Sequence, residues 1–198
     1  TLARVQSSTR ARFVAAPVGR FLRGRTWALG CPVAGLYVTI FGGRPDEADM
    51  RELAGAYRVR AGGTPHVVLF DGSRVEAVDA AAHDLLIRYF TERAARFTPN
   101  LTRAAFVHGD GPAGALFAGY RKVLPLPDCE TRSFADTDAA LQWLGAAVTV
   151  RAEVVALAAS LGSVDPALVR FQALLEERPS VSLAKAAHLL AIAPRSLQ

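Results

Sequence analysis

The chain has 198 residues, of which 51% are hydrophobic and 21% are charged, a length that suits one large domain or a medium domain followed by a small one. This composition excludes extended disorder, and the lack of an apolar run of about 18 residues excludes a predicted membrane span. The two cysteines, Cys31 and Cys129, are too few and too far apart for a disulfide or metal framework. We therefore expect free thiols and a cytoplasmic location.

Positive charge is concentrated at the beginning of the chain. Seven arginines precede the first acidic residue, Asp46, and the remainder of the chain carries a formal net charge of −2 against +5 for the whole. A basic arm of this kind attracts polyanions such as nucleic acid. The alternative is an arginine-rich surface that is simply solvated, and the charge run alone favours that interpretation.

Residues 1–147 show strands alternating with helices. The strands are predicted from short β-branched or aromatic runs and the helices from apolar residues at i, i+3 and i+4. Turn chemistry separates them, with Asp71-Gly72 as one turn and Asp79 as a helix cap. We predict strands within 10–29 and over 35–41, 66–70, 103–108 and 129–134, and helices from Pro45, over 79–97, over 116–124 and around 140–144. The pattern predicts an α/β domain in which helices pack on a sheet.

The remaining residues are predicted to be entirely helical. A linker helix is expected over 148–163, followed by a small all-α domain over 164–198. Its helices begin at Asp165, Ser182 and Pro194, each at a residue typical of a helix start. Short helices joined by tight turns are the plan of a helix-turn-helix, which needs a small residue at the crossing, and Ala187 supplies one.

Residues 182–198 (SLAKAAHLLAIAPRSLQ) resemble the first helix-turn-helix of AraC-type transcription regulators. The resemblance implies that the chain stops inside the recognition helix, so that DNA binding belongs to the full-length protein. It also implies a homodimer formed through the N-terminal domain, which senses a small-molecule or protein effector. The DNA surface would then include Ser182, Arg195, Ser196 and Gln198, where Arg and Gln read base edges and Ser contacts phosphate. A small helical bundle with a surface arginine is the alternative.

Residues 69–86 (LFDGSRVEAVDAAAHDLL) resemble the STAS fold of anti-sigma-factor antagonists. In that family a strand leads to an Asp-Ser-Ser-Gly motif at a helix start, and a partner kinase phosphorylates one of the serines. Here Asp79 keeps the acid, but Ala80, Ala81 and Ala82 replace the other residues, so no hydroxyl is present to accept phosphate. The resemblance implies a protein-interaction module without this switch, which is the alternative to a DNA-binding regulator.

No residues form a catalytic set in the sequence, so we predict no catalytic, metal-binding or cofactor-binding residues. Residues 109–114 (GDGPAG) match the GxGxxG pattern of dinucleotide sites. Pro112 removes one amide donor, however, and Asp110 places a negative charge where a pyrophosphate would bind. We therefore interpret this segment as a Gly/Pro turn, with a nucleotide-binding enzyme as a third hypothesis. The histidines share no metal-ligand spacing.

Overall fold

A computed structural model of the chain describes residues 6–57, 64–97, 99–124, 126, 129–161 and 185. Residues 1–161 form one compact unit and residues 162–198 a second one. Lys185 is the one described residue of the second unit, where it is helical and exposed.

Seven strands form a single sheet in which the spatial order equals the chain order. The pairs β2–β3 and β3–β4 are antiparallel, and the pairs from β4 through β7 are parallel. The β1–β2 pair is also parallel. The strands are β1 (Gln6–Ser7), β2 (Arg20–Arg23), β3 (Trp27–Val33), β4 (Leu36–Gly43), β5 (His66–Val75), β6 (Leu101–His108) and β7 (Glu130–Phe134).

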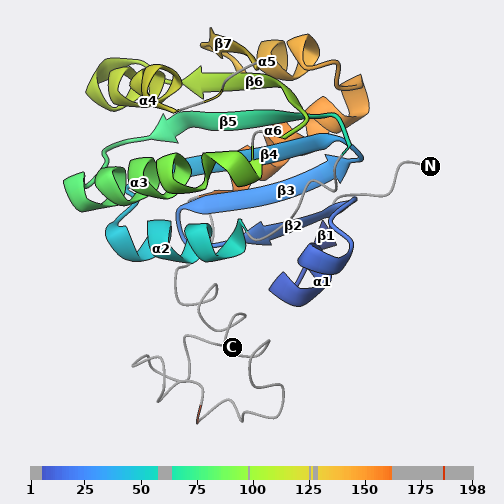
Figure 1. Cartoon of the computed structure of the whole chain (residues 1–198), viewed down its shortest axis with the longest axis horizontal. Coiled ribbons are helices and arrows are strands. Elements are labelled where there is room, and N and C mark those ends of the chain that lie inside the picture. The colour runs from blue at the N-terminus through green and yellow to red at the C-terminus, as the bar shows by residue number, and fades with distance from the viewer. Residues whose placement is uncertain are drawn as a thin grey trace. The chain divides into compact units, whose positions relative to one another are not determined.

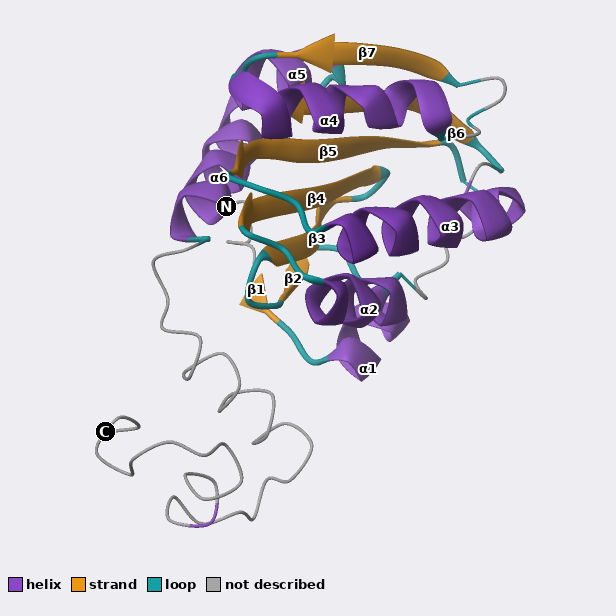
Figure 2. Cartoon of the chain, turned by 90° about the vertical axis from the view of Figure 1, so that its left-hand side faces the viewer, coloured by secondary structure: helices purple, strands orange, loops and turns teal. Residues whose placement is uncertain are grey.

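Helices cover both faces of the sheet (Figures 1 and 2). The crossover helices α2 (Glu47–Ala56), α3 (Ala80–Phe97) and α4 (Gly111–Val123) share one face with α1 (Arg10–Ala15), because right-handed crossovers between neighbouring parallel strands all pass over the same side. The other face is covered by α5 (Thr137–Trp143) and α6 (Val148–Ser160). The predicted α/β class is confirmed for this unit.

Two separate apolar cores result from this arrangement. The core beneath the crossover helices is rich in aromatic rings, with Phe70 stacked on Phe106 at a centroid distance of 5.2 Å. The core on the opposite face is aliphatic, and there Ile40 and Leu69 are fully buried against α5 and α6. The strands β4, β5 and β6 therefore carry apolar side chains on both faces, as expected for a covered parallel sheet.

Three local predictions differ from the structure. Residues 10–15 form helix α1, whose Phe13 is completely buried, although 10–29 was expected to contain only strands. Asp71 and Gly72 lie inside β5 and do not form a turn, because this strand extends to Val75. The helix predicted over 116–124 begins earlier, because α4 starts at Gly111. The helix predicted over 148–163 is observed as α6, and its Val150 and Val154 are buried in the aliphatic core of the first unit.

Candidate functional site at the ends of β4 and β5

The carboxyl ends of β4 and β5 bring two helix starts side by side. Parallel strands end at the same edge of a sheet, and here each leads directly into a helix, α2 after β4 and α3 after β5. Gly43 closes β4 with a φ of 65°, a left-handed conformation that favours glycine. Its carbonyl accepts a hydrogen bond from the Glu76 amide at 2.8 Å, which joins the two loops.

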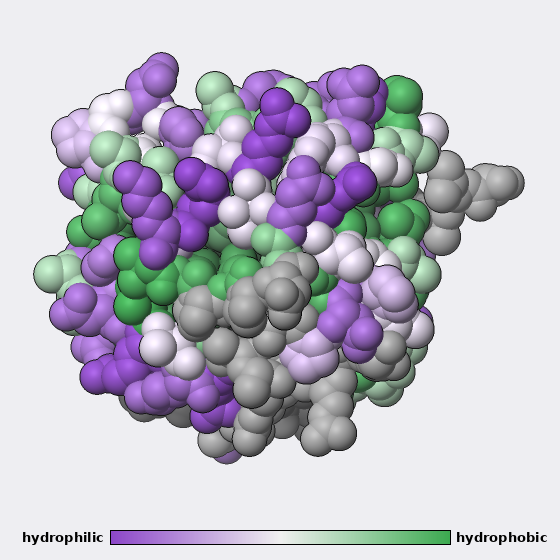
Figure 3. All heavy atoms as spheres, turned by 45° about the horizontal axis from the view of Figure 1, so that its top comes forward, coloured by the Kyte–Doolittle hydropathy of each residue, from purple (hydrophilic) through white to green (hydrophobic). Residues whose placement is uncertain are grey.

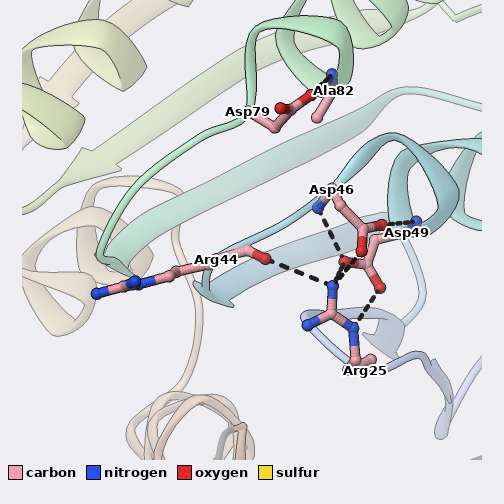
Figure 4. Close-up of polar contacts among 6 residues, drawn as sticks. All are labelled: Arg25, Arg44, Asp46, Asp49, Asp79 and Ala82. Atoms are coloured by element: carbon pink, nitrogen blue, oxygen red, sulfur yellow. Dashed lines mark hydrogen bonds and ion pairs between the residues drawn. The ribbon is translucent and has the colours of Figure 1, made fainter.

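The start of α2 is a reciprocal capping box (Figure 4). The Asp49 amide donates to Asp46 Oδ1 at 2.9 Å, and the Asp46 amide donates to Asp49 Oδ2 at 3.0 Å. These bonds satisfy amides that the first turn of a helix otherwise leaves unpaired. The hydrogen bond from the Asp49 amide is the largest cause that holds the pKa of Asp46 below its usual value, and Arg25 adds to it.

Arg25 joins both carboxylates of the capping box. Its Nη2 lies 2.7 Å from Asp46 Oδ2 and also contacts Asp49 Oδ2, while its Nε donates to Asp49 Oδ1 at 3.2 Å. The Asp49 side chain is only 6% exposed. Burying a carboxylate carries a large desolvation cost, and the ion pair with Arg25 offsets part of that cost for Asp49.

Asp79 caps the start of α3 as the sequence predicts. Its Oδ1 accepts a hydrogen bond from the Ala81 amide at 2.9 Å. It also accepts one from the Ala82 amide at 3.2 Å (Figure 4). Ala82 is completely buried in the aromatic core. Because Ala80 to Ala82 carry no hydroxyl, this first turn has no group that could accept a phosphate.

The edge formed by these two helix starts has an excess of negative charge. Arg44 makes an ion pair with Glu76, Nε to Oε2 at 3.3 Å, in which both side chains are largely exposed. The edge holds three arginines, Arg25, Arg44 and Arg74, and the four carboxylates of Asp46, Asp49, Glu76 and Asp79, so the formal net charge is −1. The first-turn amides of Asp49, Ala81 and Ala82 already donate to the capping carboxylates, so these amides are not available to an external anion.

The expected basic arm does not stand free in the described residues. Arg25 and Arg44 pair with acidic side chains, as above, and Arg10 Nη2 donates to the Glu52 carbonyl at 3.4 Å. Arg20 donates to the Ala16 carbonyl. Sequence analysis grouped these arginines by their position along the chain, whereas the fold pairs several of them individually. The one signal that could have found part of the cluster is the Asp46-x-x-Asp49 spacing of a capping box.

The glycine-rich segment after β6 is shaped by packing. A Cβ added to Gly114 would lie 1.7 Å from the Gly109 carbonyl oxygen, so only glycine allows α4 to approach the strand end. Asp110 is the N-cap of α4, but its side chain makes no capping hydrogen bond. Residues 111–114 form the first turn of α4, so the Gly/Pro turn predicted over 109–114 is limited to Gly109 and Asp110.

A buried carboxylate on β5 was missed by the sequence analysis. Asp71 is fully buried on the face covered by α5. Its Oδ2 accepts a hydrogen bond from Thr137 Oγ1 at 2.6 Å, and its Oδ1 accepts from the Ser73 amide at 2.9 Å and the Ser73 hydroxyl at 2.7 Å. All the partners seen here are neutral groups of the protein, so we interpret Asp71 as an anchor for α5.

The residues predicted to bind DNA, Ser182, Arg195, Ser196 and Gln198, lie outside the described residues. Three histidines are described, and each has a separate partner: His66 contacts the Thr64 carbonyl, His83 the Tyr120 hydroxyl and His108 the Gly109 carbonyl. Within the described ranges, no three His, Cys, Asp or Glu side chains are grouped so that they could hold a metal ion. In the same ranges, no helix combines the length and the apolar character needed to cross a membrane.

Comparison with solved structures gives a likeness of fold, whereas the other comparisons find no match. No known family profile and no curated protein matches the chain. Among solved structures, it is similar to an uncharacterized protein of the DUF3478 family with a SpoIIAA-like fold, from Shewanella loihica PV-4. The two share 19% identity with a TM-score of 0.40, over 55% of this chain and 83% of that chain. The α/β class assigned to the first unit therefore comes from its sheet order and helix placement, and not from this likeness.

Proposed function

We propose that the first unit is a non-catalytic protein-docking module of a cytoplasmic transcription regulator. The observation that carries the docking role is the pair of self-capped helix starts at the ends of β4 and β5. Asp79 occupies the amides of Ala81 and Ala82, and no hydroxyl follows it in the first turn of α3. A surface built in this way is held in one conformation and cannot be switched by phosphate at this helix start.

The charge of this edge indicates the kind of partner. Its outermost carboxylate is Glu76, whose side chain is 64% exposed and makes only a surface ion pair with Arg44. Such pairs contribute roughly 0–1 kcal/mol to stability, so Glu76 is free to exchange partners. We propose a protein partner with a basic patch, because complementary charges speed encounter and exclude partners of the wrong sign.

The regulator part of the proposal is supported by the residue pattern of 182–198. In this proposal, DNA is contacted in the full-length protein by Ser182, Arg195, Ser196 and Gln198. The proposal also includes a homodimer formed through the first unit and a small-molecule or protein effector. The alternative is a module of anti-sigma-factor-antagonist type that binds a kinase-like partner and has no operator preference. The observation in its favour is Asp79, which keeps the acid of the STAS motif at a helix start after a strand.

The docking role is tested by charge reversal. Immobilised wild-type protein, Glu76→Lys and the matched control Glu92→Lys are compared for the proteins they retain from a lysate of the source cells, quantified by mass spectrometry. Glu92 is exposed and lies on α3, more than three helical turns beyond its start. We expect at least one basic protein to be retained by the wild type and the control and lost with Glu76→Lys. Equal retention by all three proteins would refute docking at this edge.

The regulator role is tested by DNA binding of the full-length protein. Promoter fragments and random-sequence DNA are titrated at several salt concentrations, with Arg195→Ala as the variant. A regulator gives sequence-dependent affinity above the salt-dependent background, and loss of a base-reading arginine weakens it by about 1–3 kcal/mol. Binding that follows salt alone, together with capture of an anti-sigma-type kinase, would favour the alternative.

A further inference from the structure

Among the described residues, no strand pairs with the outer edge of the sheet at β7. Figure 1 shows β7 as the last strand of the sheet, and among the described residues only β6 pairs with it. The opposite edge strand, β1, has only two residues, whereas β7 has five. An edge strand presents a row of unpaired amides and carbonyls to which a further strand can add.

Alternation along β7 places its charged residues on one face. Glu130, Arg132 and Phe134 are separated by two residues each, so they point the same way. Phe134 contacts the Trp143 ring of α5 at a centroid distance of 5.6 Å, which identifies this as the α5 face. Glu130 and Arg132 therefore lie two positions apart on the same side of an open edge, and both are exposed.

The two charges differ in their present pairing. Glu130 Oε2 lies 3.4 Å from Arg103 Nε in a surface ion pair. Arg132 lies over the Phe134 ring, with Cζ 5.6 Å from the centroid, and no described carboxylate pairs with it. An acidic group placed opposite Arg132 would neutralise an exposed cation at the edge of the sheet.

We infer that β7 pairs antiparallel with the β7 of a second copy of this chain, about a two-fold axis through Thr131. In this register Glu130 of each copy stands opposite Arg132 of the other, so two opposite-charge pairs flank a Thr131–Thr131 pair, all favourable cross-strand combinations. The inference deepens the homodimer included in the proposed function by giving it a surface.

Charge selects this register over its neighbours. A two-fold axis through Glu130 would place two glutamates opposite each other, and one through Arg132 would do the same with two arginines. An axis through Ser133 would set Glu130 opposite Asp136. Like charges directly opposite are destabilising, so only the axis through Thr131 leaves the ladder without a repulsive pair.

The pairing is expected to be reversible. Five residues at one edge bury less surface than the roughly 1,200 Å² of a stable interface, so the dimer belongs to the weak class. Figure 3 shows a face of the molecule on which hydrophilic and hydrophobic residues are mixed.

The test uses two charge reversals and their mixture. Sedimentation velocity is recorded for the wild type, Glu130→Arg, Arg132→Glu and the control Glu92→Arg, from about 5 to about 500 μM, a range suited to weak association. We expect the wild type and the control to dimerise with rising concentration, and each edge variant to associate at least tenfold more weakly. An equimolar mixture of the two edge variants should dimerise again, because every facing pair in the mixed dimer then has opposite charges.

Each contrary result has one meaning. A wild type that stays monomeric throughout, edge variants that dimerise like the wild type, or a mixture that fails to associate would each overturn pairing through β7. Glu76→Lys is included to separate this inference from the docking proposal, since it should dimerise normally. A β7 dimer that fails while docking at Glu76 persists would remove only the present inference.

Discussion

Replacing Thr137 by valine tests how α5 is held on the sheet. The change keeps the shape of the side chain and removes the hydroxyl that donates to Asp71 Oδ2 at 2.6 Å. Asp71 is fully buried, so water cannot take the place of the lost donor. A typical hydrogen bond contributes about 0.5–1.5 kcal/mol, and leaving a buried acceptor short of a partner costs about 1–3 kcal/mol. We expect the free energy of unfolding to fall by about 2 kcal/mol, which corresponds to a loss of about 4–8 °C in Tm for a unit of this size.

Urea unfolding followed by tryptophan fluorescence measures this change, because Trp27 lies under the crossover helices and Trp143 ends α5. The matched control is Thr102→Val, whose hydroxyl donates to the neutral His66 carbonyl at 3.1 Å from an exposed position. That bond is expected to contribute about 1 kcal/mol or less. If both variants lose the same free energy within about 0.5 kcal/mol, the anchoring role of Asp71 is refuted.

Three further predictions concern single residues. Gly114→Ala should abolish cooperative unfolding or lower Tm steeply, since its Cβ would lie 1.7 Å from the Gly109 carbonyl oxygen; a circular-dichroism melt like that of the wild type would contradict this packing. Arg25→Ala should lower the free energy of unfolding in urea by about 1–3 kcal/mol, because the substitution leaves the Asp49 carboxylate without a cation. The expected loss is below the range for a fully buried pair, since the Arg25 side chain is 33% exposed. A change under about 0.5 kcal/mol would show that Asp49 needs no cation. Burial raises the pKa of the Cys31 thiol from 9.0 to about 11, so the folded state binds the thiol proton more tightly than the unfolded state does. The resulting stabilisation of the folded state should be present below pH 9 and lost as the pH rises toward 11. Unfolding measured from pH 8 to 11 should show a weaker pH dependence for Cys31→Ala, and identical slopes would argue against the shift.

The sequence was sufficient for the elements whose signals are local. The helix over 79–97 was predicted from apolar periodicity and an Asp cap, and it is observed as α3 with Asp79 bonded to the amides of Ala81 and Ala82. The strand predicted over 103–108 is β6. Both signals depend on neighbours within one helical turn or one strand, which a single sequence contains.

What sequence analysis missed depends on contacts between distant residues. Asp71-Gly72 has the composition of a turn, but Thr137, 66 positions away, supplies the hydrogen bond that keeps this carboxylate inside a strand. Arg25 is one of several arginines in a basic run, and only the fold shows that it belongs with Asp46 and Asp49. In each case a contact with a residue distant in the sequence decides the structure. A single sequence does not show which distant residues will be in contact.

The strictly sequential order of the sheet has a consequence for how the chain folds. Every strand from β2 to β7 pairs first with the strand that precedes it, so the sheet can grow by one unit at a time and needs no strand inserted between two others. Each parallel pairing must still close over a crossover helix, which slows folding, but a nascent chain could begin this growth during synthesis. The aliphatic face must wait for α5 and α6, which come last, so chains released before residue 161 would expose Ile40 and Leu69 and should be prone to aggregation.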